Sequence, residues 1–423
     1  MQRGLDLSRV RGSGPSGAVT ARDEHAAISE LAHTTETDDD APVHRTVLRL
    51  AAFVVASLVA SCAHVETATT PSAPSLTEEQ VAALIPARVK DRDGWAEDVV
   101  AAIRLTKKEP TAERACAVLA VVEQESGYQA DPAVPDLPNV VMRALQEKLT
   151  ALGPAEGPAL DALLDEKMPG SDRTVREKIA KLKTERDLDR MFRDVAAAYR
   201  AQNPGSFAVA GALSAVLGKG GIEDLNPVTT AGSMQVKVAF AKQLGHLDDD
   251  AARDLLYTRA GGVRFGTARL IGYDAHYDDV AFRFADYNSG MFASRNAAFQ
   301  RILSEMTGEE LVLDGDLLAY DKDGSPKSDE TRSLRALLDF GAAHGISSWT
   351  VHRDAKKEKS ADFEETDSWK AVRQAWRDKH GQEPPYARIP DVALVSPKLK
   401  HARTTSWYAD SVKKRYDACR ARP

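Results

Sequence analysis

The chain has 423 residues, of which 43% are hydrophobic, enough to bury the core of one large domain or two medium ones. Its formal net charge is −7 and charges of both signs are spread along the chain, which excludes the basic surface typical of nucleic-acid binding. Aromatic residues make up only 6% and alanine is abundant, which favours helices over a β-sandwich. The three cysteines form no CxxC or Cys/His cluster, so we predict no metal site and no cofactor.

An apolar run over residues 50–60 follows two arginines and ends at Ser61-Cys62. This order is typical of a secretory signal, and the run is shorter than the roughly 20 residues that a permanent membrane helix needs. Val59-Ala60-Ser61-Cys62 resembles the bacterial lipobox, whose cysteine is lipidated. The alternative is a signal peptide or interfacial helix with an incidental cysteine. Because Ala63 and not aspartate follows the cysteine, we expect the outer membrane as the destination.

The N-terminal region divides into three predicted segments. Residues 1–42 are polar and match no targeting signal, so they are either a disordered leader or precede the true translation start. Residues 43–62 are the predicted signal peptide, and residues 63–76, rich in Thr, Ser and Pro, are a predicted flexible tether. The folded part would then lie in the periplasm, anchored to the outer membrane by a lipid on Cys62.

The folded part begins with helical patterns. Thr77 fits a capping box, and Thr111 is expected to cap the start of another helix. In that second helix apolar residues between 115 and 122 share one face, and Glu125 continues the row before Gly127 ends it. Glu123 points to another face and is interpreted as solvated or structural. A carboxylate at the end of an apolar stripe is costly unless it has a function.

Further helical patterns are separated by Pro-Gly pairs and polar turns. After residue 310 the pattern changes to a pair of short strands over 311–324, a polar loop, a helix at 330–343 and a charged tail. The polar loop contains Asp321, Asp323 and Ser325, which we interpret as turn residues because no calcium-binding glutamate follows at the required offset. The other predicted helices are 140–152, 158–167, 173–201, 231–244 and 255–273.

Three separated segments of the chain contain short motifs that are interpreted together. The first is Glu125-Ser126, the second is Gly232-Ser233-Met234-Gln235, and the third is Ala285-Asp286-Tyr287-Asn288-Ser289-Gly290. In this order they resemble the catalytic motifs of Slt-type lytic transglycosylases, which have a goose-lysozyme-like fold. That family has a Gly-x-x-Tyr-Leu pattern between the last two motifs, where this chain has Gly266-Thr267-Ala268-Arg269-Leu270 with arginine in place of tyrosine.

The resemblance covers roughly residues 95–305 and implies a mainly α-helical, lysozyme-like catalytic domain at 77–310. Compact family members have a few tens of residues between the first two motifs, whereas roughly a hundred separate them here. The helices at about 135–205 would therefore be an insertion that forms a groove wall or lid. Residues 311–423 would be a small mixed C-terminal extension, an architecture that also resembles a family of proteobacterial lipoproteins.

The resemblance implies that Glu125 alone is the catalytic acid and base. N-acetylmuramic acid supplies its own C6 hydroxyl as the nucleophile, so one carboxyl group can cleave the MurNAc-GlcNAc β-1,4 bond and leave a 1,6-anhydro product. The apolar helical face would desolvate Glu125 and favour its protonated form. The residues implied to contact substrate, or for Ser126 to stabilise the turn, are Ser126, Met234, Gln235, Tyr287 and Asn288, with core packing as the alternative for Met234 and Tyr287.

Two other functions stay open at this point. A hydrolytic muramidase of the same fold would need a second carboxylate, for which Asp286, Asp131 and Asp136 are candidates. A non-catalytic lipoprotein that binds peptidoglycan would have no need for Glu125. In each case the expected partner is the peptidoglycan glycan strand, and the expected state is a monomer.

Cys116 lies in the same predicted helix as Glu125, nine residues before it, and Cys419 lies near the C-terminus. In an oxidising periplasm these two cysteines could form a disulfide that ties the tail to the catalytic helix. The alternative is a buried thiol and a separate free cysteine in the tail.

Overall fold

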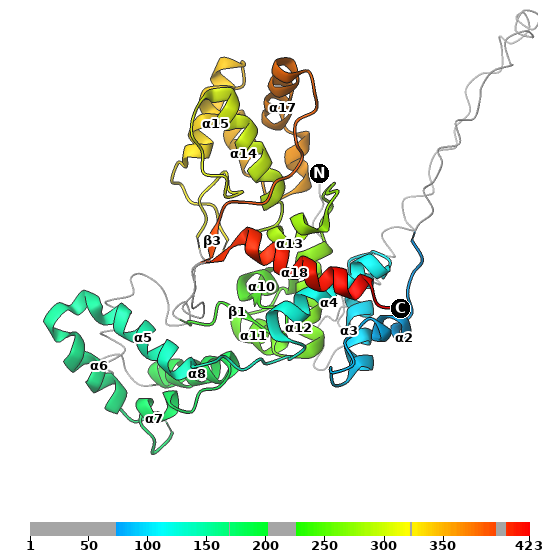
Figure 1. Cartoon of the computed structure of the whole chain (residues 1–423). Helices are drawn as coiled ribbons and strands as arrows, with labels where there is room; N and C mark the ends of the chain where they lie inside the picture. Colours follow the sequence, from blue (N-terminus) through cyan, green and yellow to red (C-terminus); the bar gives the residue numbers. More distant parts are fainter. Residues whose placement is uncertain (1–72, 169, 202–225, 322–323, 395–402) are drawn as a thin grey trace, which may run out of the picture. The chain divides into compact units, whose positions relative to one another are not determined.

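The computed structural model describes residues 73–168, 170–201, 226–321, 324–394 and 403–423 (Figure 1). The predicted leader, the predicted signal peptide with Cys62 and most of the predicted tether lie outside these residues. The last tether residues are part of the fold, because the Leu76 N–H donates to the Pro110 carbonyl at 2.9 Å and Ser75 pairs with Thr111. Among the described residues no helix has the length and apolarity needed to cross a membrane.

The described chain is mainly α-helical. Its first helices are α2 (Glu78–Ala83), α3 (Arg92–Leu105) and α4 (Ala112–Ser126), and the starts of α2 and α4 and the end of α4 lie where the sequence predicts. The Thr77 side chain accepts from the Gln80 N–H in a capping box, and the Thr111 side chain accepts from the Arg114 N–H. Gly127 ends α4 in the left-handed region at φ 59°, a conformation that costs glycine little.

The predicted insertion is a separate group of helices (Figure 1). Its elements are α5 (Leu137–Leu149), the 3-10 helix η3 (Thr150–Ala155), α6 (Glu156–Asp165), α7 (Val175–Ile179) and α8 (Glu185–Ala201). They enclose a small core of their own, centred on Leu164 and Ile179. The single helix predicted at 173–201 is two helices, because the Asp187 carboxylate accepts from the N–H groups of Lys183 and Thr184 and starts α8 anew.

The second motif forms a hairpin where a helix was predicted. Strands β1 (Thr230–Ala231) and β2 (Val236–Lys237) pair in antiparallel fashion, and α10 (Val238–Gly245) follows. The turn places Gly232 at φ 80° and Gln235 at φ 49°, both outside the range of a right-handed helix. The helix predicted at 255–273 is α12 (Arg259–Ile271), and residues 255–256 belong instead to the end of α11 (Asp249–Leu256). The third motif ends α13 (Val280–Ser289), and α14 (Ala293–Thr307) follows.

In the described part of the predicted strand pair, residues 311–321 and 324, no strand forms. These residues are irregular, with one isolated bridge between Tyr320 and Pro326, because side chains such as Gln300 and Glu358 accept from the loop's backbone N–H groups. Asp321 forms a turn, with its N–H donating to the Ser325 carbonyl at 2.9 Å. The elements that follow are α15 (Arg332–Ala343), α16 (Ser348–Ala355), η6 (Ala361–Glu365), α17 (Asp367–His380), the paired strands β3 (Ala393–Leu394) and β4 (Arg403–Thr404), and α18 (Thr405–Arg420).

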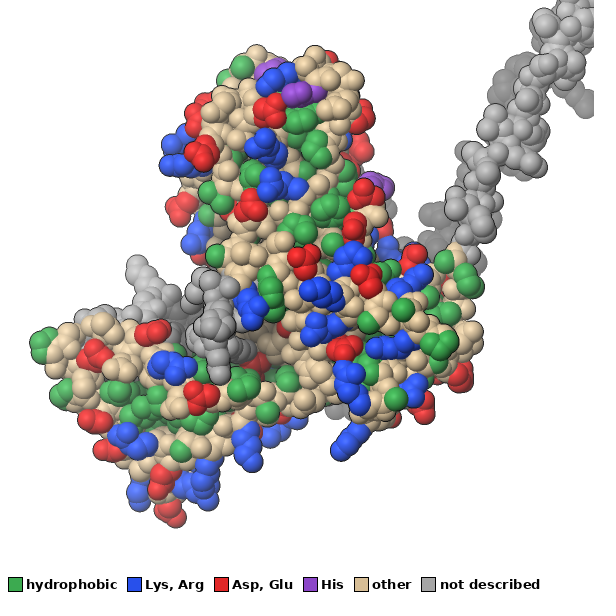
Figure 2. All heavy atoms as spheres, viewed as in Figure 1, with side chains coloured by type: hydrophobic (Ala, Val, Ile, Leu, Met, Phe, Trp, Pro, Cys, Tyr) green, Lys and Arg blue, Asp and Glu red, His purple; other side chains and the backbone are tan. Residues whose placement is uncertain are grey.

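The described residues also form two larger hydrophobic cores. The boundary between these cores does not fall at residue 310, where the predicted catalytic domain ends. The first core contains α2, α3, α4 and the hairpin, together with buried residues of α18 such as Tyr408 and Val412. The second core contains helices α15 to α17 and already begins in α14, where Phe299 packs on Phe363 and Trp369. The chain therefore leaves the first core after α13 and returns to it with α18. On the face shown in Figure 2, basic and acidic side chains are intermixed, as the even charge distribution predicts.

Candidate active site

Glu125 lies in the last turn of α4, and its side chain is partly exposed. The Tyr408 hydroxyl of α18 donates a hydrogen bond to Glu125 Oε1. Tyr408 itself is buried, and burial together with the negative charge of Glu125 raises the pKa of its hydroxyl well above the usual value. Tyr408 therefore stays protonated and acts as a fixed donor to the carboxylate.

A disulfide joins the same two helices. Cys116 and Cys419 are bonded with a Cα–Cα distance of 5.6 Å, which confirms the predicted pairing. Since Cys116 precedes Glu125 by nine residues and Cys419 follows Tyr408 by eleven, α4 and α18 run antiparallel. The covalent bond and the Glu125–Tyr408 hydrogen bond are thus about 15 Å apart along the pair, so the disulfide helps to hold Tyr408 in place.

Ser126, the second residue of the first motif, stabilises the end of α4. It is buried, its hydroxyl donates to the Val122 carbonyl at 3.0 Å, and the same oxygen accepts from the Gln129 N–H at 3.3 Å. Of the two roles that the resemblance implies for Ser126, the structure shows the turn-stabilising one. Glu123 forms an ion pair with Arg88, in agreement with its interpretation as a structural residue.

Tyr287 connects the second and third motifs beside Glu125. Its hydroxyl donates to the Met234 carbonyl at 2.6 Å, and its pKa is raised first by burial and then by the charge of Glu125. Arg269, the residue in the position where the resembled family has tyrosine, donates two hydrogen bonds to the Tyr287 carbonyl, at 2.9 and 3.1 Å. The Met234 side chain has no exposed surface and packs where a Cβ on Gly266 would collide with it. Met234 is therefore a core residue, which was the alternative to a substrate contact.

Gln235 and Asn288 both bind other parts of the protein. Gln235 Nε2 donates to Glu185 of α8 at 2.9 Å, which links the hairpin to the insertion. Asn288 Nδ2 donates to Thr405 Oγ1 at 3.3 Å, which links the third motif to the start of α18. These two side chains therefore position the insertion and the C-terminal helix around the motifs.

The sequence motifs give no indication of Tyr408, Thr405 and Glu185. Tyr408 and Thr405 lie in the C-terminal helix, outside the range that the resemblance covers. Glu185 lies in the insertion, which the compact members of the resembled family lack. One signal could have located Tyr408. A Cys116–Cys419 disulfide places the last helix beside α4, and helical spacing then brings Tyr408 close to Glu125.

The three candidate second carboxylates have structural partners. Asp286 is buried, and it accepts from the Tyr273 hydroxyl at 2.9 Å, the Tyr277 hydroxyl at 2.6 Å and the Ser294 N–H at 2.6 Å. Asp131 accepts from the Thr184 hydroxyl, and Asp136 accepts from the Asn139 side chain. Burial raises the pKa of both Asp286 and Asp131. Within the described part of the chain no group of three His, Cys, Asp or Glu residues could hold a metal ion.

Comparison with known proteins matches residues 88–422 to the family described as "Protein of unknown function (DUF1615)". YaiW from Escherichia coli, which is described as uncharacterized, is 36% identical over 345 residues, covering 79% of this chain and 87% of the relative. No solved structure matches the chain. The matched range includes the three motifs, the insertion and α18.

Proposed function

The chain belongs to the DUF1615 family, and we propose that it is a lytic transglycosylase that cleaves the MurNAc-GlcNAc β-1,4 bond of peptidoglycan with Glu125. One observation carries the proposal. A partly exposed carboxylate at the end of an apolar helix is hydrogen-bonded by a buried tyrosine, at the point where three motif segments meet. The resemblance to a lysozyme-like catalytic domain supports the same assignment.

The proposed reaction needs two proton transfers by Glu125. As the glycosidic bond breaks, protonated Glu125 gives its proton to the leaving oxygen. The carboxylate then takes the proton of the C6 hydroxyl while that oxygen bonds to C1, which closes the 1,6-anhydro ring without consuming water. Between the two steps the Tyr408 hydroxyl stabilises the carboxylate and keeps it oriented.

The proposed location is the periplasm, with a lipid anchor on Cys62. The disulfide between Cys116 and Cys419 supports an oxidising compartment, because such bonds persist outside the reducing cytosol. A position beside the outer membrane would place the enzyme next to its substrate.

Digestion of purified peptidoglycan sacculi tests the reaction. We expect soluble muropeptides that end in 1,6-anhydro-N-acetylmuramic acid, identified by mass spectrometry. Muropeptides with reducing ends would instead identify a hydrolytic muramidase. If the purified chain releases nothing while a lysozyme control digests the same sacculi, the protein is a non-catalytic binder and the proposal is wrong.

A further inference from the structure

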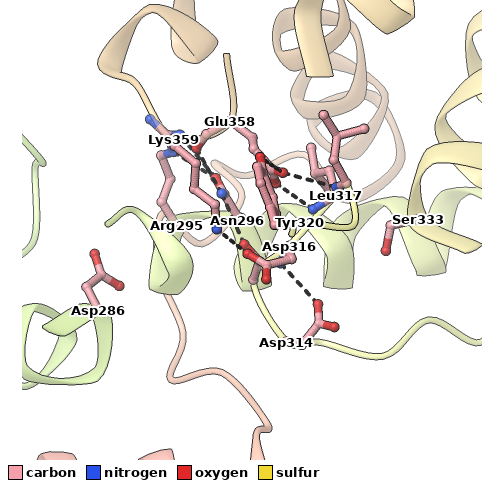
Figure 3. Close-up of polar contacts among 12 residues, drawn as sticks. Asp286, Arg295, Asn296, Asp314, Asp316, Leu317, Tyr320, Ser333, Glu358 and Lys359 are labelled. Carbon is pink, nitrogen blue, oxygen red and sulfur yellow. Dashed lines mark hydrogen bonds and ion pairs between the residues drawn. The ribbon is translucent and has the colours of Figure 1, made fainter. Parts of the chain in front are cut away.

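A buried polar network around Glu358 fixes a short segment of the second core (Figure 3). The Glu358 carboxylate accepts from the Tyr320 hydroxyl and from two backbone N–H groups of the loop before it. The Glu358 carbonyl accepts from Arg295 at 2.7 Å and from Asn296 at 2.9 Å. Glu358, Arg295 and Asn296 have no exposed surface, so the backbone that carries the next residue is held on several sides.

That next residue is Lys359. Its ammonium group lies 3.3 Å from the position that a Cβ on Gly290 would take, and Gly290 is the last residue of the third motif. The same ammonium pairs with Asp316 and lies 5.0 Å from the centre of the Tyr320 ring. With 29% of its side chain exposed, Lys359 is placed by the fold and still open to solvent.

A second lysine, which follows the second motif, lies within electrostatic range of Lys359 and Asp316. Lys237 is in β2, two residues after Gln235, and is exposed as a residue. The pKa of its ammonium group is lowered, first by partial burial and then by the positive charges of Arg269 and Lys359, while Asp316 opposes this shift. Lys237 and Lys359 therefore bring two positive charges near the carboxylate of Asp316. Such an excess of positive charge costs free energy when the site is empty, and a bound anion would remove that cost.

We propose that Lys359 and Lys237 form a subsite that binds a carboxylate of the glycan substrate beside the cleaved bond. The inference rests on the proposed function and names the part of the substrate that this site recognises. Peptidoglycan strands carry carboxylates on their stem peptides and, where the peptide has been removed, on the lactyl group of muramic acid. Chitin has the same β-1,4 linkage and carries no carboxylate, so the subsite would select peptidoglycan over neutral glycans.

Binding measurements in a Glu125→Gln background separate recognition from cleavage. Three ligands are titrated by calorimetry: a GlcNAc-MurNAc tetrasaccharide with stem peptides, the same tetrasaccharide with free lactyl groups, and chitotetraose. We expect Lys359→Gln and Lys237→Gln each to weaken binding of at least one of the two carboxylate-bearing ligands by about ten-fold. The affinity for chitotetraose should stay unchanged in both variants. Lys356→Gln, an exposed lysine in the same segment, is the matched control and should change neither.

Asp316→Asn separates a binding role from a purely structural one. It frees Lys359 from its partner, so a carboxylate subsite should bind its anionic ligand more tightly in this variant. Equal weakening of all three ligands by Lys359→Gln and Asp316→Asn would overturn the inference and leave the proposed function intact. If none of the three ligands binds to the Glu125→Gln protein, the proposed function fails and the subsite with it. If the lysine variants lose affinity for only the peptide-bearing ligand, or for only the lactyl ligand, that difference identifies the carboxylate that is bound.

Discussion

Glu125 and Glu358 each accept a hydrogen bond from a tyrosine hydroxyl, yet their surroundings differ. Glu125 is partly exposed at the end of α4 and meets Tyr408. Glu358 is buried, meets Tyr320, and its two oxygens also accept from backbone N–H groups. A carboxylate can transfer protons to a substrate only where the substrate can reach it. The exposure of Glu125 is therefore compatible with the proposed proton transfer, whereas the burial of Glu358 fits a structural role.

The largest expected effect is on catalysis by the exposed carboxylate. Glu125→Gln removes the transferable proton, and we expect release of anhydro-muropeptides to fall by about 10²–10⁴-fold with the unfolding temperature nearly unchanged. Muropeptide release from sacculi measures it. Glu123→Gln, in the same turn and paired with Arg88, is the control and should keep activity. Full activity of the Glu125→Gln protein would show that the site is assigned to the wrong residue.

The disulfide belongs to the Glu125 region, so its removal should affect that region most. It closes a loop of about three hundred residues, and we expect the Cys116→Ala, Cys419→Ala double variant to lose about 2–5 kcal/mol of unfolding free energy. Thermal unfolding of this variant, and of the wild type with and without reductant, measures the loss. Unchanged stability in both experiments would mean that α18 is held on α4 without the bond.

The buried carboxylate should make stability depend on pH. Burial raises the pKa of Glu358 from 4.5 to about 7, so between these values the folded chain holds a proton that the unfolded chain has released. The stabilisation is complete below pH 4.5 and is lost as the pH rises through 7, with a magnitude of at most about 3 kcal/mol. Urea unfolding at pH 5 and pH 8 should show wild type losing stability relative to Glu358→Gln. Parallel changes in the two proteins would contradict the assignment.

The smallest expected effect concerns the tyrosine that binds Glu125. Tyr408→Phe keeps the ring in the core and removes the donor, so we expect turnover to fall by about 10–100-fold with little loss of stability. Tyr416→Phe, in the same helix with its ring 6.0 Å from that of Phe284, is the matched control. Equal turnover rates for the two variants would show that Tyr408 contributes only to packing. The hydrogen bond to Glu125 would then be structural, like the hydrogen bond from Tyr320 to Glu358.

Local sequence signals predicted the parts of this protein that depend on neighbouring residues. Thr77, Thr111 and Gly127 mark helix ends because caps act within one turn, and the structure confirms all three. The helix predicted over the second motif is wrong in its first half, because Gly232 and Gln235 adopt left-handed backbone conformations that a right-handed helix cannot contain. The predicted strand pair at 311–324 is absent from its described residues, because Gln300 and Glu358, distant in sequence, accept hydrogen bonds from the backbone there.

The sequence by itself determined Glu125 as the candidate acid, the mainly helical fold and the pairing of Cys116 with Cys419 as one of two possibilities. Only the tertiary structure decided which distant side chains reach that acid and the three motifs. Tyr408 comes from α18 and Lys359 from the second core, and both reach the motifs because the chain leaves the first core after α13 and returns to it with its last helix. Contacts of this kind depend on long-range packing, which no local pattern of caps, turns or apolar spacing encodes.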